Sequence, residues 1–201
     1  MHRRDFIKKV ILFSFSFVIL KTKIMANTLF KPFNLVDGVF VNNYVSHKSS
    51  FKDFWKWRRE SSKPKPITFP IIENDPEYLK SNKSKKTITW IGHSTFLLQI
   101  DGINILTDPH FTKRASPLGF AGPLRTTPPG LKLEDLPFID FVLISHNHYD
   151  HLDKKTIQLL LKKQNLNQPT FFVPLKLKKI MSKLGAKNIF EHEWWQISMF
   201  K

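Results

Sequence analysis

The stretch LISHNHYDHLD, from Leu143 to Asp153, limits what this chain can fold into more than any other part of the sequence. Three of the eight histidines fall within the six positions 146–151. They follow a nearly continuous apolar run, Phe138–Ser145, which predicts a strand buried on both faces. Residues 152–165 carry apolar side chains at three-to-four spacing and predict a helix. The histidines therefore lie at the carboxyl end of a strand, where sites in layered α/β folds gather.

The residue types in this cluster indicate a metal site. The chain has no cysteine, which excludes disulfides and thiolate sites and leaves nitrogen and oxygen as ligands. Zinc binds imidazole and carboxylate at about 2.0–2.2 Å, and two metal ions about 3.5–4 Å apart can hold a phosphoryl centre. In a tight loop, two imidazoles can bind one ion while the carboxylate and the third imidazole face another. The candidate ligands are His146, His148, Asp150 and His151.

The segments around the cluster predict a mixed α+β fold. Residues 87–100 are rich in β-forming residues, and Asp101-Gly102 is a hairpin signal before the returning strand INILTDP. A loop dense in proline and glycine spans 114–130, a length that is uncommon without a functional reason. Beyond the cluster, the chain alternates between strand and helix. The predicted segments are a strand at 169–174, a helix at 175–185 that ends at Gly185, and one or two short strands within 187–198.

These residues together resemble a known family. SHNHYDHLD is similar to the metal-binding signature of the metallo-β-lactamase superfamily. TWIGHSTFLLQIDGINILTDPHFTKRASPLGFAGPLR and IDFVLISHNHYDHLD narrow the resemblance to the N-acylphosphatidylethanolamine-hydrolysing phospholipase D family, most specifically over residues 88–153. The resemblance implies a layered αββα sandwich with two zinc ions. It also implies hydrolysis of the phosphodiester in N-acylated phosphatidylethanolamines, which releases N-acylethanolamine and phosphatidic acid.

The resemblance assigns roles to individual residues. By match, His146 and His148 bind the first zinc ion, and Asp150 and His151 bind the second. Asp150 is also placed to orient the attacking water, which makes it the catalytic candidate. These assignments are expectations that follow from the family and from the matching motif.

Two further residues are candidates for holding the ligating side chains in position through hydrogen bonds. Ligating histidines usually donate their other ring N–H to an acceptor. Asp108, in LTDP, lies at the end of a neighbouring strand and can act as such an acceptor. His93, in GHST, is a candidate for similar support, and its alternative role is that of a buried, hydrogen-bonded strand residue.

The sequence departs from the family after Trp194-Trp195. The resemblance implies later ligands, namely a histidine for the first zinc ion, an aspartate that bridges both ions and a histidine for the second. Here six residues follow the tryptophans, and His192 precedes them. We therefore expect residues 87–201 to form only the N-terminal half of the sandwich, with an incomplete metal site and an exposed apolar face. A second polypeptide or a dimer partner can complete the site, and the alternative is a truncated, catalytically inactive remnant.

The amino terminus is typical of an export signal. RRDFIK, which begins at Arg3, resembles the twin-arginine motif, and the apolar run from Val10 to Leu20 is shorter than the about 20 residues that span a bilayer. We expect residues 1–26 to be a signal or an N-terminal anchor, which exports the chain to the periplasm or associates it with a membrane. If the signal is not functional, the chain is cytoplasmic. A short amphipathic or buried helix is the alternative.

The segment 27–86 is a basic, aromatic extension. The net charge of +16 favours anionic partners, although a lysine-rich solvated surface needs none. Phe51–Glu60, FKDFWKWRRE, predicts a short helix that can lie on a membrane or a nucleic-acid backbone, or pack its aromatics on the domain. An anionic phospholipid substrate or membrane surface is the partner that the resemblance favours. A basic module that binds membranes or nucleic acid without catalysis is the remaining alternative.

Overall fold

The computed structural model describes residues 34–42, 50–61, 70 and 72–199. Contacts within the chain divide it into two compact units, Glu60–His192 on the one hand, and Met1–Arg59 with Glu193–Lys201 on the other. The predicted export signal, residues 1–26, lies outside the described part. Among the described helices, none is long and apolar enough to cross a membrane.

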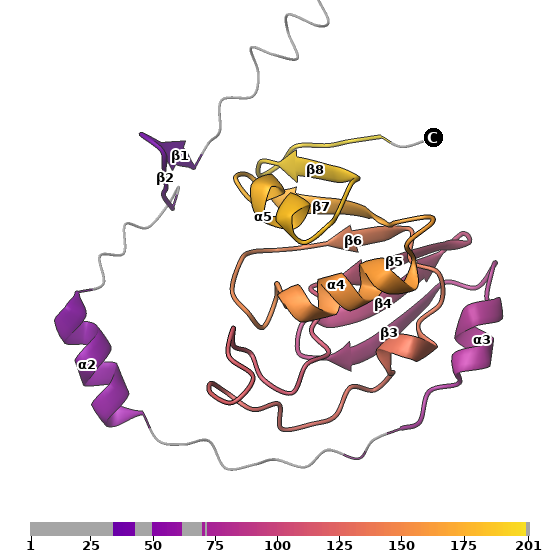
Figure 1. Cartoon of the computed structure of the whole chain (residues 1–201), viewed down its shortest axis with the longest axis horizontal. Helices are drawn as coiled ribbons and strands as arrows, with labels where there is room; N and C mark the ends of the chain where they lie inside the picture. Colours follow the sequence, from indigo (N-terminus) through magenta and orange to yellow (C-terminus); the bar gives the residue numbers. More distant parts are fainter. Residues whose placement is uncertain (1–33, 43–49, 62–69, 71, 200–201) are drawn as a thin grey trace, which may run out of the picture. The chain divides into compact units, whose positions relative to one another are not determined.

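The unit Glu60–His192 is built on a six-stranded sheet (Figure 1). Its strands are β3 (Thr87–Gly92), β4 (Thr95–Ile100), β5 (Ile103–Thr107), β6 (Phe141–Leu143), β7 (Thr170–Pro174) and β8 (Ile189–His192). They lie side by side in the order in which they occur in the sequence. β4 is antiparallel to both of its neighbours, and the strands from β5 to β8 run parallel to one another.

Helices cover one face of this sheet. α4 (Lys154–Lys163) and α5 (Lys178–Lys183) lie in front of it in Figure 1. α4 forms where the three-to-four spacing predicted a helix, and α5 is shorter than the predicted 175–185. The core between sheet and helices consists of almost fully buried apolar side chains. They include Leu97, Leu106, Leu136, Ile139, Val142, Leu152, Ile157, Leu160, Phe171 and Met181.

The opposite face of the sheet carries exposed apolar side chains, as the sequence led us to expect. Successive side chains of a strand point to opposite faces, so each strand that buries one residue presents the next one outward. The ring of Phe172 contacts those of Phe141 and Phe190, with centroid separations of 5.7 and 5.8 Å. The apolar residues more than a third exposed on these strands are Ile88, Trp90, Ile100, Ile103, Leu143 and Phe190.

One strand prediction was wrong. The run Phe138–Ser145 was expected to be a strand buried on both faces, but the strand β6 is shorter and only one of its faces is covered. Val142 is fully buried, whereas its neighbour Leu143 is 38% exposed. The reason is that, among the described residues of this unit, the helices α4 and α5 pack on the same side of the sheet, so an apolar run need not mean burial on both sides.

The β-rich segment 87–100 contains two strands and a turn between them. The chain reverses at Gly92 and His93, whose φ angles are 142° and 51°. The first of these angles suits glycine, because side chains of L-residues rarely adopt it. The predicted hairpin at Asp101-Gly102 is confirmed, and both of its residues have positive φ, at 51° and 82°.

A buried polar network attaches the short helix α3 (Pro76–Ser81) to the sheet. Gln99 of β4 is 1% exposed, and its Nε2 donates to the carbonyl of Leu79 at 2.7 Å and to Oδ1 of Asn104 at 2.9 Å. Its Oε1 accepts a hydrogen bond from Nδ2 of Asn82 at 3.1 Å. Leu79 itself belongs to the hydrophobic core, so the packed unit includes residues that precede β3.

In its described residues, the second unit contains a small hairpin and the helix α2. β1 (Leu35–Val36) pairs with β2 (Val39–Phe40), and α2 spans Phe51–Glu60, where the sequence predicted a helix. A capping box begins α2: the backbone N–H and the hydroxyl of Ser50 donate to Oδ2 of Asp53 at 2.8 and 2.7 Å, and the N–H of Asp53 donates back at 3.2 Å.

Replacing Gln99 by leucine should destabilise the unit. The substitution keeps the volume but leaves Leu79, Asn82 and Asn104 without this hydrogen-bond partner in a buried region. An unsatisfied buried polar group costs about 1–3 kcal/mol, so we expect the free energy of unfolding in urea to fall by at least about 2 kcal/mol. Gln158→Leu, on the exposed side of α4, is the matched control and should change it by less than about 0.5 kcal/mol. Equal effects of the two substitutions would refute the role of the network.

Candidate metal centre

Residues that can bind metal gather at one edge of the sheet. β3 runs in the same direction as β5, because both are antiparallel to β4, and β6 is parallel to β5. The carboxyl ends of these strands therefore meet at the same edge. His93 follows β3, Asp108 follows β5, and residues 145–151, the histidine loop, follow β6.

The histidine loop is fixed at both ends. Before it, Ile144 is buried, and its N–H donates to the carbonyl of Phe172 at 2.9 Å. After it, Leu152 is 2% exposed, and its N–H donates to the carbonyl of His148 at 2.7 Å. Asp153 then caps α4 by accepting hydrogen bonds from N–H groups of its first turn. The chain between these anchors forms a tight turn, which places several polar side chains close together at the sheet edge.

Asp108 joins the histidine loop to β5. It is 6% exposed and has a φ of 36°, which aspartate tolerates better than most residues. Its Oδ1 accepts from the N–H of Ser145 at 2.7 Å, and its Oδ2 lies 2.7 Å from the Ser145 hydroxyl and 2.8 Å from Nδ1 of His151. Because Nδ1 carries the proton in this contact, Nε2 of a neutral His151 presents a lone pair to a metal ion.

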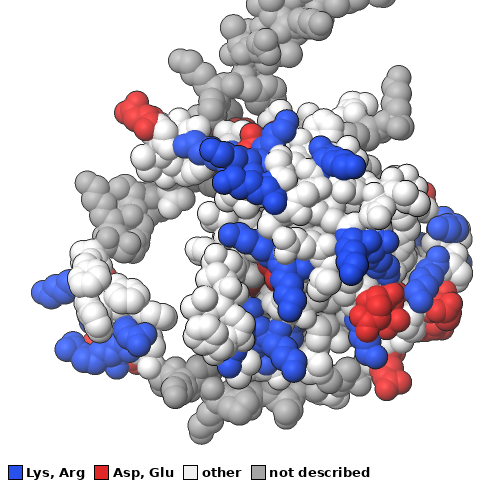
Figure 2. All heavy atoms as spheres, in the orientation of Figure 1, with Lys and Arg blue, Asp and Glu red and all other residues white. Residues whose placement is uncertain are grey.

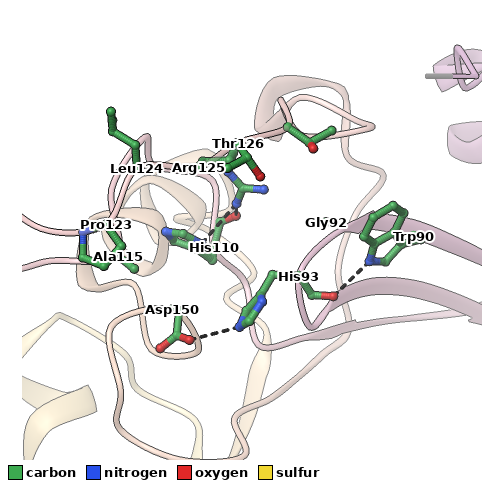
Figure 3. A pocket seen from close by; sticks show the side chains of 11 residues that line it. Trp90, Gly92, His93, His110, Ala115, Pro123, Leu124, Arg125, Thr126 and Asp150 are labelled. Atoms are coloured by element: carbon green, nitrogen blue, oxygen red, sulfur yellow. Dashed lines mark hydrogen bonds and ion pairs between the residues drawn. The ribbon is translucent and has the colours of Figure 1, made fainter. Parts of the chain in front are cut away.

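Three side chains of ligand type converge in front of Asp108. Nε2 of His93 lies 3.0 Å from Oδ2 of Asp150 and 3.4 Å from Nε2 of His151. Within the described residues, one donor atom of each lies within 4.8 Å of the others, which is close enough for one ion. His93 and Asp150 face each other in Figure 3. The sequence suggested a supporting role for His93, whereas the structure places its ring beside the donor atoms of the candidate ligands.

His146 and His148 form a second pair of donors. Nε2 of His146 lies 3.1 Å from Nδ1 of His148, and the ring centroids of His146 and His151 are 4.0 Å apart. Two nitrogens bound tetrahedrally to one zinc ion, at about 2.0–2.1 Å each, lie about 3.3 Å from one another. The observed spacing therefore fits a shared ion. The structure thus brings together the four candidate ligands predicted from the sequence, and it places the ring of His93 beside two of them.

The surroundings of the cluster favour the protonation states that metal binding needs. Burial lowers the pKa of His146, and the neighbouring His151 and His148 lower it further, so its imidazole is neutral at pH 7. Burial raises the pKa of Asp150, but its own backbone N–H, His151 and His93 together lower it more, so the carboxyl is ionised. Neutral imidazole and ionised carboxylate are the forms that bind metal. The donor set fits a divalent ion held by nitrogen and oxygen.

Comparison with known proteins identifies the family. The family model described as a beta-lactamase superfamily domain matches residues 87–190. The chain belongs to the β-lactamase superfamily. An N-acyl-phosphatidylethanolamine-hydrolyzing phospholipase D of Caenorhabditis elegans is 45% identical over 118 residues, which are 56% of this chain and 32% of that protein. An uncharacterized protein of Mycobacterium bovis is 38% identical over 171 residues, 81% of this chain and 45% of that protein.

The match to the family model confirms the superfamily and the fold class expected from the sequence. The mixed sheet with helices on one face is the layered arrangement expected of a metallo-β-lactamase-like chain. Among solved structures, an isothiocyanate hydrolase from Delia radicum gut bacteria aligns with a TM-score of 0.41 and 26% identity, over 53% of this chain and 41% of that one. The chain spans between about a third and a half of the length of the two curated relatives, at 32% and 45%.

Sequence reasoning missed two residues beside the cluster. His110 is 4% exposed, and its Nδ1 lies 3.1 Å from Nη2 of Arg125. Both line a pocket together with His93 and Asp150. The length of the loop 114–130 predicts a functional role, and Arg125 lies within this loop. No local sequence pattern, however, connects this arginine to His110.

Asp108→Asn should weaken metal binding without removing a ligand. Asparagine offers only one acceptor oxygen, so Nδ1 of His151 and the two donors of Ser145 cannot all keep their partners. Losing such an outer partner of a ligand lowers metal affinity about 10- to 100-fold. The affinity can be measured by titration with Co2+ and its visible absorption. Asp101→Asn, in an exposed hairpin, is the matched control, and an affinity of Asp108→Asn equal to that of the control would contradict the assignment.

Proposed function

We propose that this chain takes part in the zinc-dependent hydrolysis of a phosphodiester in an N-acylated phosphatidylethanolamine or a related phospholipid. The observation that carries the proposal is the convergence of His93, Asp150 and His151 on one point at the sheet edge. The 45% identity to the Caenorhabditis elegans phospholipase D supports the class of substrate. Because the chain spans 32% of that relative, the proposal includes a second copy of the chain or another polypeptide that completes the site.

Four residues of the cluster have parts in the proposed reaction. His146 and His148 would hold one metal ion, and Asp150 and His151 would hold the other. Bound zinc lowers the pKa of water to about 7 and polarises a phosphoryl oxygen. Asp150 orients the attacking water and accepts its proton as the water oxygen bonds to phosphorus. The bond between phosphorus and the ethanolamine oxygen breaks, and that oxygen takes up a proton, so the products are phosphatidic acid and N-acylethanolamine.

His148→Ala should abolish the hydrolysis while sparing the fold. The side chain is exposed at the sheet edge and contributes nothing to the core, but it is one of the two donors for one ion. We expect the zinc-dependent release of N-palmitoylethanolamine from N-palmitoyl phosphatidylethanolamine, followed by mass spectrometry, to fall at least about 100-fold, more than the loss of an outer partner. Asn147→Ala, in the same loop, should keep the activity. Full activity of His148→Ala would show that the site is assigned wrongly.

The zinc content of the purified chain separates the proposed hydrolase from an inactive remnant. About two zinc ions per chain by elemental analysis, as a dinuclear site requires, and their loss in His146→Ala, would support a site completed by another copy or polypeptide. A chain that holds no zinc and releases no product would be an inherited partial site, and the proposal would fail for this chain.

α2 supports a lipid surface as the place of the reaction. Three of its rings, those of Phe51, Phe54 and Trp55, contact one another with centroid distances of 5.9–6.1 Å. Trp57 extends this group through Phe54, at 6.1 Å. The result is a side of the helix rich in aromatic rings, on which Arg58 also lies, four residues after Phe54.

The other side of α2 is cationic. Lys52, Lys56 and Arg59 lie at spacings of four and three residues, which puts them on one face. No residue of α2 is buried, and a helix of this length is marginal in water by itself. An aromatic side and a basic side are typical of helices that lie in the interface of an anionic bilayer. On the unit with the sheet, Figure 2 shows Lys and Arg side chains spread over the visible face rather than gathered in one groove.

Lipid contact of α2 can be measured through its own tryptophans. In vesicles of phosphatidylglycerol with brominated acyl chains, we expect the tryptophan fluorescence of the chain to be quenched. The double substitution Trp55→Phe, Trp57→Phe should remove most of the quenching, because these rings would lie among the acyl chains. Trp90→Phe, on the sheet, should leave it unchanged. Quenching that survives in the double variant would place α2 away from the bilayer.

A further inference from the structure

A pocket of about 350 Å³ opens beside His93 and Asp150. Its walls come from the turn after β3, the segment after β5, the long loop and the histidine loop. Figure 3 shows Arg125 and His110 next to each other above Asp150 and His93. The pocket therefore combines the carboxylate assigned to the attacking water with a guanidinium group that has no part in the metal site.

Arg125 is held in place by the chain around it. Its N–H donates to the carbonyl of Lys113 at 2.8 Å, and its Nε donates to that of Thr112 at 3.4 Å. Its Nη2 donates to the carbonyl of His110 and lies 3.1 Å from Nδ1 of the same residue. Nη1 takes part in none of these contacts. The backbone and side chain thus fix the orientation of the guanidinium and leave one edge of it available.

The charge of Arg125 has no ion-pair partner in the described part of the chain, where no carboxylate oxygen lies within 4.0 Å of it. Burial lowers the pKa of Arg125, and Asp153 acts against this shift. Asp153, however, is engaged elsewhere, because its Oδ2 accepts hydrogen bonds from Thr112 and Thr156. A half-buried guanidinium without its own carboxylate is suited to an anionic ligand.

Gly92 makes room for the available edge of the guanidinium. A Cβ at this position would lie 2.7 Å from Nη1 of Arg125. Since His93 follows Gly92 directly and faces Asp150, Nη1 lies against the same turn that supplies a residue of the metal cluster. The place where Nη1 can bind an oxygen is therefore next to the turn that faces Asp150, the residue assigned to the attacking water.

His110 sets the geometry of the pair. A guanidinium only donates hydrogen bonds, so Nδ1 of His110 is the acceptor and the proton of its neutral ring is on Nε2. Burial lowers the pKa of His110, and Arg125 lowers it further, which keeps the ring neutral. Within the described residues, the buried Nε2 has no hydrogen-bond partner. The pair therefore presents no acceptor of its own to an anion beside Nη1, because Nδ1 of His110 is engaged by the guanidinium.

We propose that Arg125 binds a non-bridging phosphoryl oxygen of the phosphodiester through Nη1, with His110 holding the guanidinium in place. This rests on the proposed function, whose substrate carries such an oxygen beside the phosphorus that water attacks. The planar fork of arginine matches phosphate oxygens, and a lysine at this position would supply charge without that geometry. The long loop after β5 then has a function, which is to carry Arg125 to the metal cluster.

The test compares two probes on the metal-free chain of 201 residues by phosphorus NMR. Dimethyl phosphate is a monoanionic diester, and trimethyl phosphate has a similar size without the charge. We expect the Kd for dimethyl phosphate to rise roughly tenfold or more in Arg125→Ala, as for the loss of a hydrogen bond to a charged group. Arg125→Lys should raise it severalfold. Arg114→Ala, whose side chain donates to Gly122 in the same loop, is the matched control and should bind like the unaltered chain.

The outcomes separate a binding role from a structural one. An unchanged Kd for dimethyl phosphate in Arg125→Ala or Arg125→Lys overturns the inference. An equal loss of affinity for dimethyl phosphate and trimethyl phosphate also overturns it, because it would mean that the loop has collapsed. Thermal unfolding of Arg125→Lys shows whether that variant is folded. The hydrolysis assay is an independent test of the proposed function. If the chain binds dimethyl phosphate through Arg125 but does not hydrolyse lipid, the phosphate site stands and the proposed function is refuted.

Discussion

The hydrogen bonds of Asp108 are the interaction on which the rest of the site depends. This carboxylate stands at the end of one strand and accepts from Ser145 and His151, which follow the neighbouring strand. It therefore fixes the position of the histidine loop relative to the sheet and the ring nitrogen that His151 can offer to metal. Without it, the candidate ligands would share a loop but would have no defined place against His93 on the adjoining turn.

The direction of the strands explains why so many functional side chains meet. Parallel pairing of β5 and β6, together with the reversal at β4, brings the ends of three strands to one edge. Each end contributes a different kind of group: a histidine beside a glycine, a buried carboxylate, and a loop of candidate metal ligands. The long loop that leaves β5 returns to the same edge with Arg125. One more strand between β5 and β6 would separate these groups.

Local patterns in the sequence were sufficient to predict much of the fold and of the candidate site. The features that they did not predict depend on contacts between distant segments. The histidine loop, α4 and the turn at Asp101-Gly102 follow from spacing and turn chemistry that act over a few residues. The turn at His93 had a signal in Gly92, but the meeting of His93 with Asp150, 57 positions later, depends on how the strands pair. α3 escaped notice because a short helix with one buried residue, Leu79, has no periodicity to detect.

The strand order also bears on how the chain folds during synthesis. Each strand of the sheet pairs with the strand made immediately before it, so no strand has to be inserted between two that are already joined. Contacts between sequence neighbours close short loops and form quickly. The residues from His93 to His151 are all made before β7, but Ile144, which leads into the histidine loop, is held by the carbonyl of Phe172 in β7. The candidate ligands are therefore held in their places once β7 has joined the sheet, and β8 is not needed for this step.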